Sequence, residues 1–366
     1  MRGVESTQVH FKGFFMADDS TPNDEYAGKM LEDESSTGKK RPWRKQKMSS
    51  RAIAASLYRC WKRHPRKYAA LKKRSDWMQQ CGNYLVFGDI VNPETGEVAR
   101  KLQAAQFCRD RLCPMCQWRK SLVTFHQLSE IMDRVDADHP NEFIPIFLTL
   151  TMKNVPSAEL GAAITRILQA WSRMMTSRHK RKPWRITGGW FRSLEITYNA
   201  ETGEWHPHIH AILLVSADYF TNPDKYIDHD AWVAEWRWAL GCDYDPSVDV
   251  RTIKNERAHA VAEVSKYAVK PGEWVNLDDA DGTDSRVELL ALELKGRRLV
   301  AFGGLMMQAR KLLKQEDAET ADLVHTGEDA EVRGDLLVAL DRFEWQVGVT
   351  NYVRVKRDVL VEPPSA

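Results

Sequence analysis

The sequence has no run of about twenty apolar residues, the length that a membrane-crossing helix requires. Its N-terminus also lacks the charged-then-apolar layout of a secretion signal. These two absences lead us to expect a cytoplasmic protein with no membrane partner. No internal repeat is visible. At 366 residues the chain is long enough to bury one large core or two modest ones.

Acidic residues are missing from one long stretch, residues 39–74, which holds fifteen Lys and Arg. The net charge is nevertheless only +2, because the segments before about residue 36 and after about residue 315 are acidic. Such a basic block suggests a polyanionic partner, and a solvated basic linker is the alternative. The block also contains aromatic residues, which favours nucleic acid over a membrane surface: Trp43, Tyr58, Trp61 and Tyr68. The spacing over residues 51–63 predicts one cationic helix.

Cysteine is scarce, with six residues in the chain. Where no export signal is present, closely spaced cysteines indicate a metal site more often than disulfides. Cys113 and Cys116 form a C-x-x-C pair with Cys108 before it, and Cys81 at the start of a strand could supply the fourth thiolate of a tetrahedral zinc site. The alternative is a redox pair, although the strand-helix context of such pairs is absent. The two other cysteines, Cys60 and Cys242, are expected to be packing residues.

Residues 144–315 alternate between strand and helix patterns. Apolar periodicity predicts strands over 146–151 and 248–253, a hairpin of strands over 189–198 and 206–215, and helices that begin near residues 157, 228, 256 and 305. The order strand, helix, strand, strand, helix, strand, helix indicates an α+β fold with a central antiparallel sheet of ferredoxin or RNA-recognition-motif type.

The second hairpin strand begins with His206, His208 and His210, whose side chains share one face because strand residues alternate. Buried imidazoles are costly unless their nitrogens are used, and a divalent metal is the usual user. The alternative is the solvated start of a strand. With the turn centred near residues 201–202, Glu195 lies across from His208, with Cβ atoms about 5 Å apart. Glu195 is therefore a candidate third ligand, and the alternative is a surface carboxylate.

The remaining histidine, His206, could be a ligand, a group that supports a ligand, or a phosphate contact. Two histidines and one carboxylate with open positions suit a hard divalent ion that handles phosphate oxygens, or a catalytic zinc or iron.

The predicted helix from residue 256 carries Glu263 and Tyr267 four positions apart, on one face, flanked by Lys266 and Lys270. By periodicity alone, a tyrosine in this position is most often a half-buried packing residue.

Five blocks in chain order resemble the single-tyrosine rolling-circle replication initiators of plasmids, members of the HUH endonucleases (histidine, hydrophobic residue, histidine). They are the cysteine block, Phe-Leu-Thr-Leu-Thr-Met-Lys-Asn over 147–154, His-Pro-His-Ile-His-Ala-Ile-Leu over 206–213, Glu-Val-Ser-Lys-Tyr-Ala-Val-Lys over 263–270 and Gly-Arg-Arg-Leu-Val-Ala-Phe-Gly-Gly over 296–304. The resemblance covers roughly residues 80–315.

The resemblance implies a chemistry for these residues. His208 and His210 would hold Mg²⁺ or Mn²⁺, with Glu195 our geometric choice for the third ligand, and the ion would polarise the scissile phosphate. Tyr267 would attack one DNA strand at the plasmid origin, giving a 5′-phosphotyrosine and a 3′-OH primer. Glu263 would activate the water that ends the cycle, and Lys266 and Lys270 could stabilise phosphate charge.

This interpretation divides the chain into five parts: an acidic disordered N-terminus (1–38), a basic helical DNA-contacting segment (39–78), a zinc-knuckle module (79–125), an HUH nicking and joining domain (140–315) and an acidic linker with a C-terminal tail (316–366). The tail over 336–355 is expected to hold a short helix and a strand. Expected partners are plasmid origin DNA and, beyond it, a host helicase and polymerase. The alternatives are a mobilisation relaxase, a single-tyrosine transposase, or a non-enzymatic zinc-knuckle DNA-binding regulator.

Overall fold

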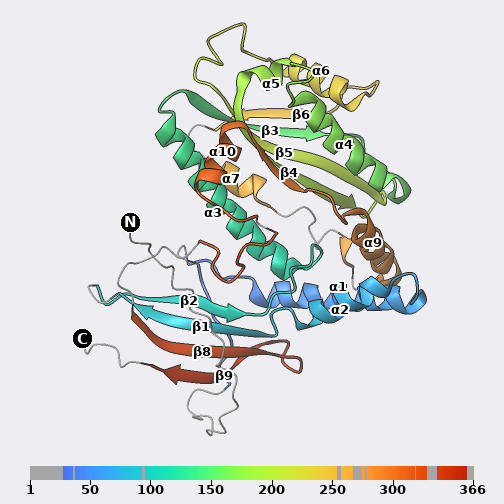
Figure 1. Cartoon of the computed structure of the whole chain (residues 1–366). Helices are drawn as coiled ribbons and strands as arrows, with labels where there is room; N and C mark the ends of the chain where they lie inside the picture. The colour runs from blue at the N-terminus through green and yellow to red at the C-terminus, as the bar shows by residue number, and fades with distance from the viewer. Residues whose placement is uncertain are drawn as a thin grey trace, which may run out of the picture.

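The computed structural model describes residues 28–35, 38–92, 95–253, 257–266, 274–276, 278–317, 319–327 and 336–360. It is an α+β structure with two antiparallel sheets and helices packed on them (Figure 1). The α+β class with an antiparallel sheet is confirmed, whereas the second sheet was not predicted. Among the described residues, none of the helices combines the length and apolar character that a membrane crossing needs.

The larger sheet has five strands in the order β6-β3-β5-β4-β7. The strands are β3 (Phe143–Thr151), β4 (Thr187–Asn199), β5 (Glu204–Ser216), β6 (Val248–Thr252) and β7 (Val300–Gly303). β5 lies at the centre and is buried almost throughout, as its unbroken apolar run predicts. The predicted order of elements is confirmed, and β7 is an additional edge strand that pairs with β4.

Helices cover both faces of this sheet. On one face lie α4 (Leu160–Met174) and α6 (His229–Leu240), with the short α5 (Lys182–Ile186) leading into β4. On the other face lie α3 (Pro114–Asp138), α7 (Arg257–Val264) and α10 (Gly304–Leu312). Ile212 and Leu214 of β5 share one buried cluster with Val261 and Val264 of α7 and with the middle of α3. The face that carries these even-numbered residues of β5 also carries His208 and His210.

The smaller sheet has four strands in the order β2-β1-β8-β9. β1 (Tyr84–Val91) and β2 (Val98–Ala105) come from the cysteine-bearing region, whereas β8 (Leu336–Gln346) and β9 (Asn351–Val359) come from the C-terminal tail. The prediction of a short helix in the tail is therefore wrong, because both of its described elements are strands. Of the N-terminal segment expected to be disordered, the structure places residues 28–31 against β9, where the Leu31 amide donates to the Tyr352 carbonyl.

The basic block forms two helices rather than the single one expected, α1 (Trp43–Arg63) and α2 (Ala69–Gln80). They lie beside the smaller sheet and meet α9 (Ala280–Glu293), a helix that the sequence analysis missed (Figure 1). At this junction Asp284, whose side chain is only 1% exposed, accepts hydrogen bonds from Ser56 and Arg59. α9 thus neutralises part of the positive charge of α1.

Candidate metal centres and nucleic-acid surface

Glu195, His208 and His210 meet on the face of the larger sheet against which α3, α7 and α10 pack. β4 and β5 pair in the predicted register, with Glu195 directly across from His208. The Glu195 Oε2 atom lies 3.1 Å from His210 Nε2 and 3.5 Å from His208 Nε2. All three side chains are buried. The ligand atoms of the group lie within 4.8 Å of one another.

The Nδ1 atoms of His208 and His210, which face away from Glu195, each have a hydrogen-bond partner. His208 Nδ1 lies 3.1 Å from the backbone carbonyl of His206, which can only accept. His210 Nδ1 lies 3.1 Å from the Thr149 hydroxyl, on the neighbouring strand β3 and directly across from His210. When both Nδ1 atoms carry the proton, each Nε2 lone pair points toward Glu195 and can bind a cation.

The distances from the Glu195 carboxylate to the two imidazole nitrogens fit a divalent ion. Two ligands that each lie about 2.1 Å from one ion are separated by roughly 3 to 4 Å, depending on geometry. The separations of 3.1 Å and 3.5 Å fall within that range. The site therefore has the donor set, the spacing and the supporting hydrogen bonds of a metal centre with open coordination positions.

His206 lies beside this group without joining it. Its ring centroid is 5.2 Å from that of His208, and its Nδ1 lies 2.8 Å from Asn154 Oδ1. Burial, and then the neighbouring His208, lowers the pKa of His206, so the ring stays neutral near pH 7. The geometry favours the role of a supporting or phosphate-contacting group over that of a third imidazole ligand. Thr149 and Asn154 are supporting residues that the sequence analysis did not single out.

The expected catalytic residues of α7 are described only in part. Glu263 is half-buried, and Lys266, just beyond the end of the helix, donates to its carboxylate. Tyr267 and Lys270 lie outside the described residues. Since Val261 and Val264 pack against the strand that carries His208 and His210, α7 lies on the same face of the sheet as these two histidines.

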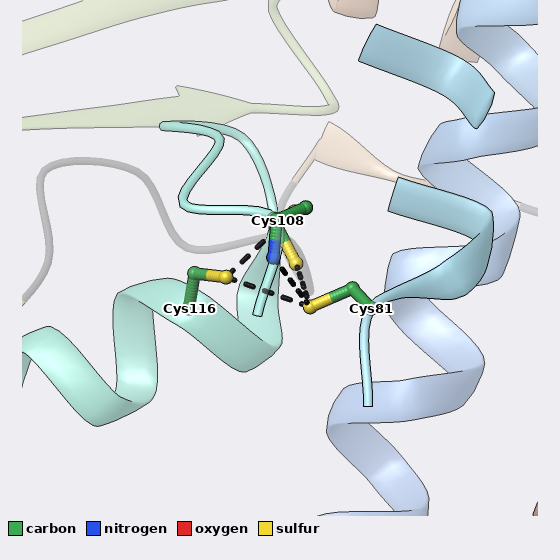
Figure 2. Close-up of side chains that lie close together, drawn as sticks. Cys81, Cys108 and Cys116 are labelled. Carbon is green, nitrogen blue, oxygen red and sulfur yellow. Dashed lines mark hydrogen bonds between the residues drawn. The ribbon is translucent and has the colours of Figure 1, made fainter. Parts of the chain in front are cut away.

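Cys81, Cys108, Cys113 and Cys116 come together as predicted. Cys81 follows α2, Cys108 follows β2, and Cys116 lies in the first turn of α3, where their sulfur atoms converge (Figure 2). The Cys81 Sγ atom lies 3.5 Å from the Sγ atoms of both Cys113 and Cys116, and the Sγ atoms of Cys108 and Cys116 are 3.7 Å apart. Two thiolates on one tetrahedral zinc ion lie about 3.8 Å apart, whereas a disulfide bond measures about 2.0 Å. The spacing therefore fits a tetrathiolate zinc site.

Backbone geometry around the cysteines supports this assignment. The residues that follow Cys81 and Cys108, namely Gly82 and Arg109, have positive φ angles of 60° and 58°. These turns direct the backbone N–H of Cys108 to Cys81 Sγ and the N–H of Arg109 to Cys116 Sγ. Burial opposes ionisation of Cys113, but hydrogen bonds from the other three thiols hold the pKa of Cys113 well below its usual value. A buried thiolate of this kind is the ligand that zinc requires.

The helices α1 and α2 present an exposed basic and aromatic surface. The ammonium of Lys72 lies 5.8 Å from the ring centroid of Tyr58 and 5.7 Å from that of Trp61. Lys73 lies 4.7 Å from the ring of Trp77, which is 57% exposed. Interleaved cations and exposed rings are features of surfaces that bind nucleic-acid backbones and stack on bases.

Comparison with known proteins identifies the family. A family model described as "Replication protein" matches residues 99–353, well over half of the chain. The chain belongs to this family of replication proteins. Protein rep of Streptococcus pneumoniae serotype 2 is 34% identical over 330 residues, which cover 88% of this chain and 95% of that relative. The resemblance found in five sequence blocks is confirmed at the level of the family.

Relatives in two other genera match over the same extent of this replication protein. Protein rep of Lactiplantibacillus plantarum is 33% identical over 333 residues, and that of Bacillus amyloliquefaciens is 33% identical over 346 residues. Each match covers 88% of this chain and nearly all of the relative, 98% and 97% respectively. No solved structure matches the chain.

Proposed function

We propose that this replication protein is a metal-dependent, site-specific DNA nicking and joining enzyme that initiates rolling-circle replication of a plasmid. One observation carries the proposal: Glu195, His208 and His210 converge on the face of β5 against which α7 packs. The family description also favours an initiator over a mobilisation relaxase or a transposase, the alternatives with the same chemistry.

In this proposal Tyr267 is the nucleophile. Its phenolic oxygen forms a bond to the phosphorus at the cut site, and the bond from that phosphorus to the 3′-oxygen breaks. The phenol loses its proton and the departing 3′-oxygen gains one, so the products are a 5′-phosphotyrosine and a 3′-OH. The 3′-OH then serves as the primer for a host polymerase, and a host helicase would separate the strands ahead of it.

A divalent ion, Mg²⁺ or Mn²⁺, held by Glu195, His208 and His210 would supply Lewis-acid polarisation of the scissile phosphate. Thr149 and the His206 carbonyl keep the two imidazoles in the ligating tautomer. Lys266 and Lys270 place positive charge beside the phosphate, where it offsets the negative charge that develops during transfer.

Glu263 is the proposed general base for the last round. Water activated by its carboxylate releases DNA without forming a second tyrosine linkage, so that the cycle ends irreversibly. Lys266 donates to this carboxylate and restricts its orientation.

Origin binding involves surfaces outside the larger sheet. We assign it to the basic and aromatic surface of α1 and α2 together with the cysteine module, in which a structural Zn²⁺ would hold Cys81, Cys108, Cys113 and Cys116. Lys and Arg side chains there would contact phosphates and set the position of the duplex.

The test is adduct formation by the Tyr267→Phe variant. With single-stranded origin oligonucleotides and Mn²⁺, wild-type protein should form a covalent 5′ adduct, and mass spectrometry of its peptides should place the DNA on Tyr267. Tyr267→Phe should form none. Tyr226→Phe, which removes a hydroxyl from a 43% exposed tyrosine, is the matched control and should react like wild type. Adduct formation by Tyr267→Phe at the wild-type rate would disprove the assignment.

A further inference from the structure

A cleft of about 400 Å³ opens beside the metal centre, on the same side of the sheet. Its walls come from α3, from the β4 and β7 edge, from residues 296–298 and from Ser265 and Lys266 at the end of α7. Ser193 lies in its floor and is directly across from His210 in the strand pairing. Two residues along β4 span about 7 Å, so the cleft begins that far from Glu195.

The cleft is strongly basic. Six cationic side chains line it: Arg111, Lys120, Lys266, Arg297, Arg298 and Arg310. Two of these, Lys266 and Arg297, also pair with glutamates of their own segments. The remaining four face the cleft with charge that only a ligand or another segment of the chain can neutralise.

A short acidic segment that follows α10, residues 315–327 (described except for residue 318), lies across this cleft. We name it the acidic strap. Two of its carboxylates enter the cleft. Glu319 lies 2.7 Å from Lys120 Nζ, which is almost fully buried, and 3.6 Å from Arg111. Asp317 lies 3.8 Å from Arg310.

The backbone of the strap is anchored on both sides of the cleft, whereas its two carboxylates are weakly held there. Gln127 and Arg310 donate to the Glu316 carbonyl, and Arg109 donates to the carbonyls of Thr320 and Ala321. Leu323 and Thr326 are buried, and Arg119 donates to the carbonyls of Leu323 and Val324. By contrast, the side chains of Asp317 and Glu319 are 58% and 41% exposed. Ion pairs with such exposed partners contribute little, because water and salt screen them. A polyanion that also gains counterion release can therefore displace the carboxylates while the anchor stays in place.

We propose that this cleft binds the phosphodiester backbone of a single DNA strand next to the cut site, and that the acidic strap occupies it as a displaceable mimic of that backbone. The inference rests on the proposed nicking function, because a strand held over the metal centre must continue along the same face of the sheet. Glu319 then marks a phosphate position between Lys120 and Arg111, and Asp317 marks another beside Arg310. Displacement of these two carboxylates by the strand couples engagement of the DNA to uncovering of the cationic side chains.

The first experiment removes the charge of the mimic. A fluorescent oligothymidylate is titrated with full-length protein in buffer without added divalent ions, and binding is followed by anisotropy. The double variant Asp317→Asn/Glu319→Gln should bind roughly fivefold more tightly than wild type. This is the effect expected when the strand no longer has to break one part-exposed ion pair. Glu316→Gln is the matched control, because Glu316 is adjacent and does not line the cleft; its affinity should equal that of wild type. An unchanged affinity of the double variant, or an equal gain in affinity in Glu316→Gln, would disprove the proposal that the strap mimics the DNA backbone.

The second experiment removes a cation from the cleft without disturbing the fold. Arg298 is exposed, so Arg298→Gln should fold normally, bind the oligothymidylate more weakly and lower the slope of log affinity against log salt by about 0.7, the loss of one single-strand phosphate contact. Lys295→Gln removes an exposed cation three positions away that does not line the cleft, and should change neither quantity. If the two variants have the same affinity and the same salt dependence, the proposal that the cleft binds DNA is wrong.

Neither titration cuts DNA, so DNA binding in the cleft and nicking by Tyr267 are tested independently. A protein that nicks but shows none of these shifts has the proposed function without this cleft. A protein that shows the shifts but forms no tyrosine adduct keeps the cleft and loses the proposed function.

Discussion

Thr149→Val tests whether the hydrogen bond behind His210 controls metal binding. Thr149 lies on β3 across from His210, and its hydroxyl is 3.1 Å from Nδ1. Valine has nearly the same shape and removes only the hydroxyl. The Nδ1–H of a ring that is just 8% exposed then faces a methyl group, and the ring of Phe147, 5.6 Å away, offers no replacement acceptor.

Two outcomes are open to the imidazole of His210 in this variant, and both weaken the site. If Nδ1 keeps its proton, a buried donor is left unsatisfied at a cost of about 1–3 kcal/mol. If the proton moves to Nε2, that nitrogen donates to Glu195 Oε2, 3.1 Å away, and no longer presents a lone pair to a cation. Loss of such supporting bonds lowers metal affinity by about 10- to 100-fold.

The measurement is Mn²⁺ binding by calorimetry, followed by nicking as a function of Mn²⁺ concentration. Thr149→Val should raise both the Kd and the half-saturating Mn²⁺ concentration by about 10- to 100-fold. Most of the nicking rate should be recovered at saturating Mn²⁺. Thr151→Val is the matched control: Thr151 is two residues along the same strand, and its hydroxyl donates to the Ser247 carbonyl. An unchanged Kd in Thr149→Val, or an equal rise in Thr151→Val, would refute the role given to this hydrogen bond.

Two further predictions concern the rest of the molecule. Cys113→Ser should lower the zinc content of the purified protein from about one ion per chain to near zero in elemental analysis, whereas Cys242→Ser, outside the cluster, should retain zinc; full zinc content in Cys113→Ser would rule out the tetrathiolate site. Asp284→Asn should lower the free energy of unfolding by about 1–2 kcal/mol, because it weakens the bonds to Ser56 and Arg59, while Asp281→Asn, fully exposed, should change it by less than about 0.5 kcal/mol in urea titrations.

The hairpin that holds the metal centre was predictable because its determinants are local. A short turn joins β4 to β5, and strand alternation then fixes which residues meet, so Glu195 opposite His208 followed from counting. The same reasoning could have identified Thr149, because Thr149 and Thr151 occupy alternate positions in an otherwise apolar strand. The end of α1 was signalled as well: the helix stops at Arg63, and Pro65 follows two residues later.

The tail could not be predicted in this way, because its partners are far away in the sequence. β8 pairs with β1, about 250 residues earlier in the chain, and no local pattern names such a partner. The charge of a residue is also a poor guide to its exposure in this sheet. Asp341 of β8 reads as a solvent-facing residue, yet its side chain is only 1% exposed and lies 2.8 Å from both Arg100 of β2 and Arg357 of β9. Buried ion pairs of this kind become visible only when the strands are assembled.

Helix α3 shows why the cysteine cluster, the cleft and the metal centre are best treated as one system. Cys116 lies in its first turn, Lys120 faces the cleft one turn later, and Ile131 and Val135 pack in the cluster that also holds α7 against β5. Because a helix is stiff over these few turns, fixing Cys116 in the tetrathiolate group fixes the position of Lys120 against Glu319. The same helix carries Arg119, which anchors the acidic strap. A zinc ion at the start of α3 would therefore do more than stabilise a module: it would set where the DNA backbone and its mimic bind relative to His208 and His210.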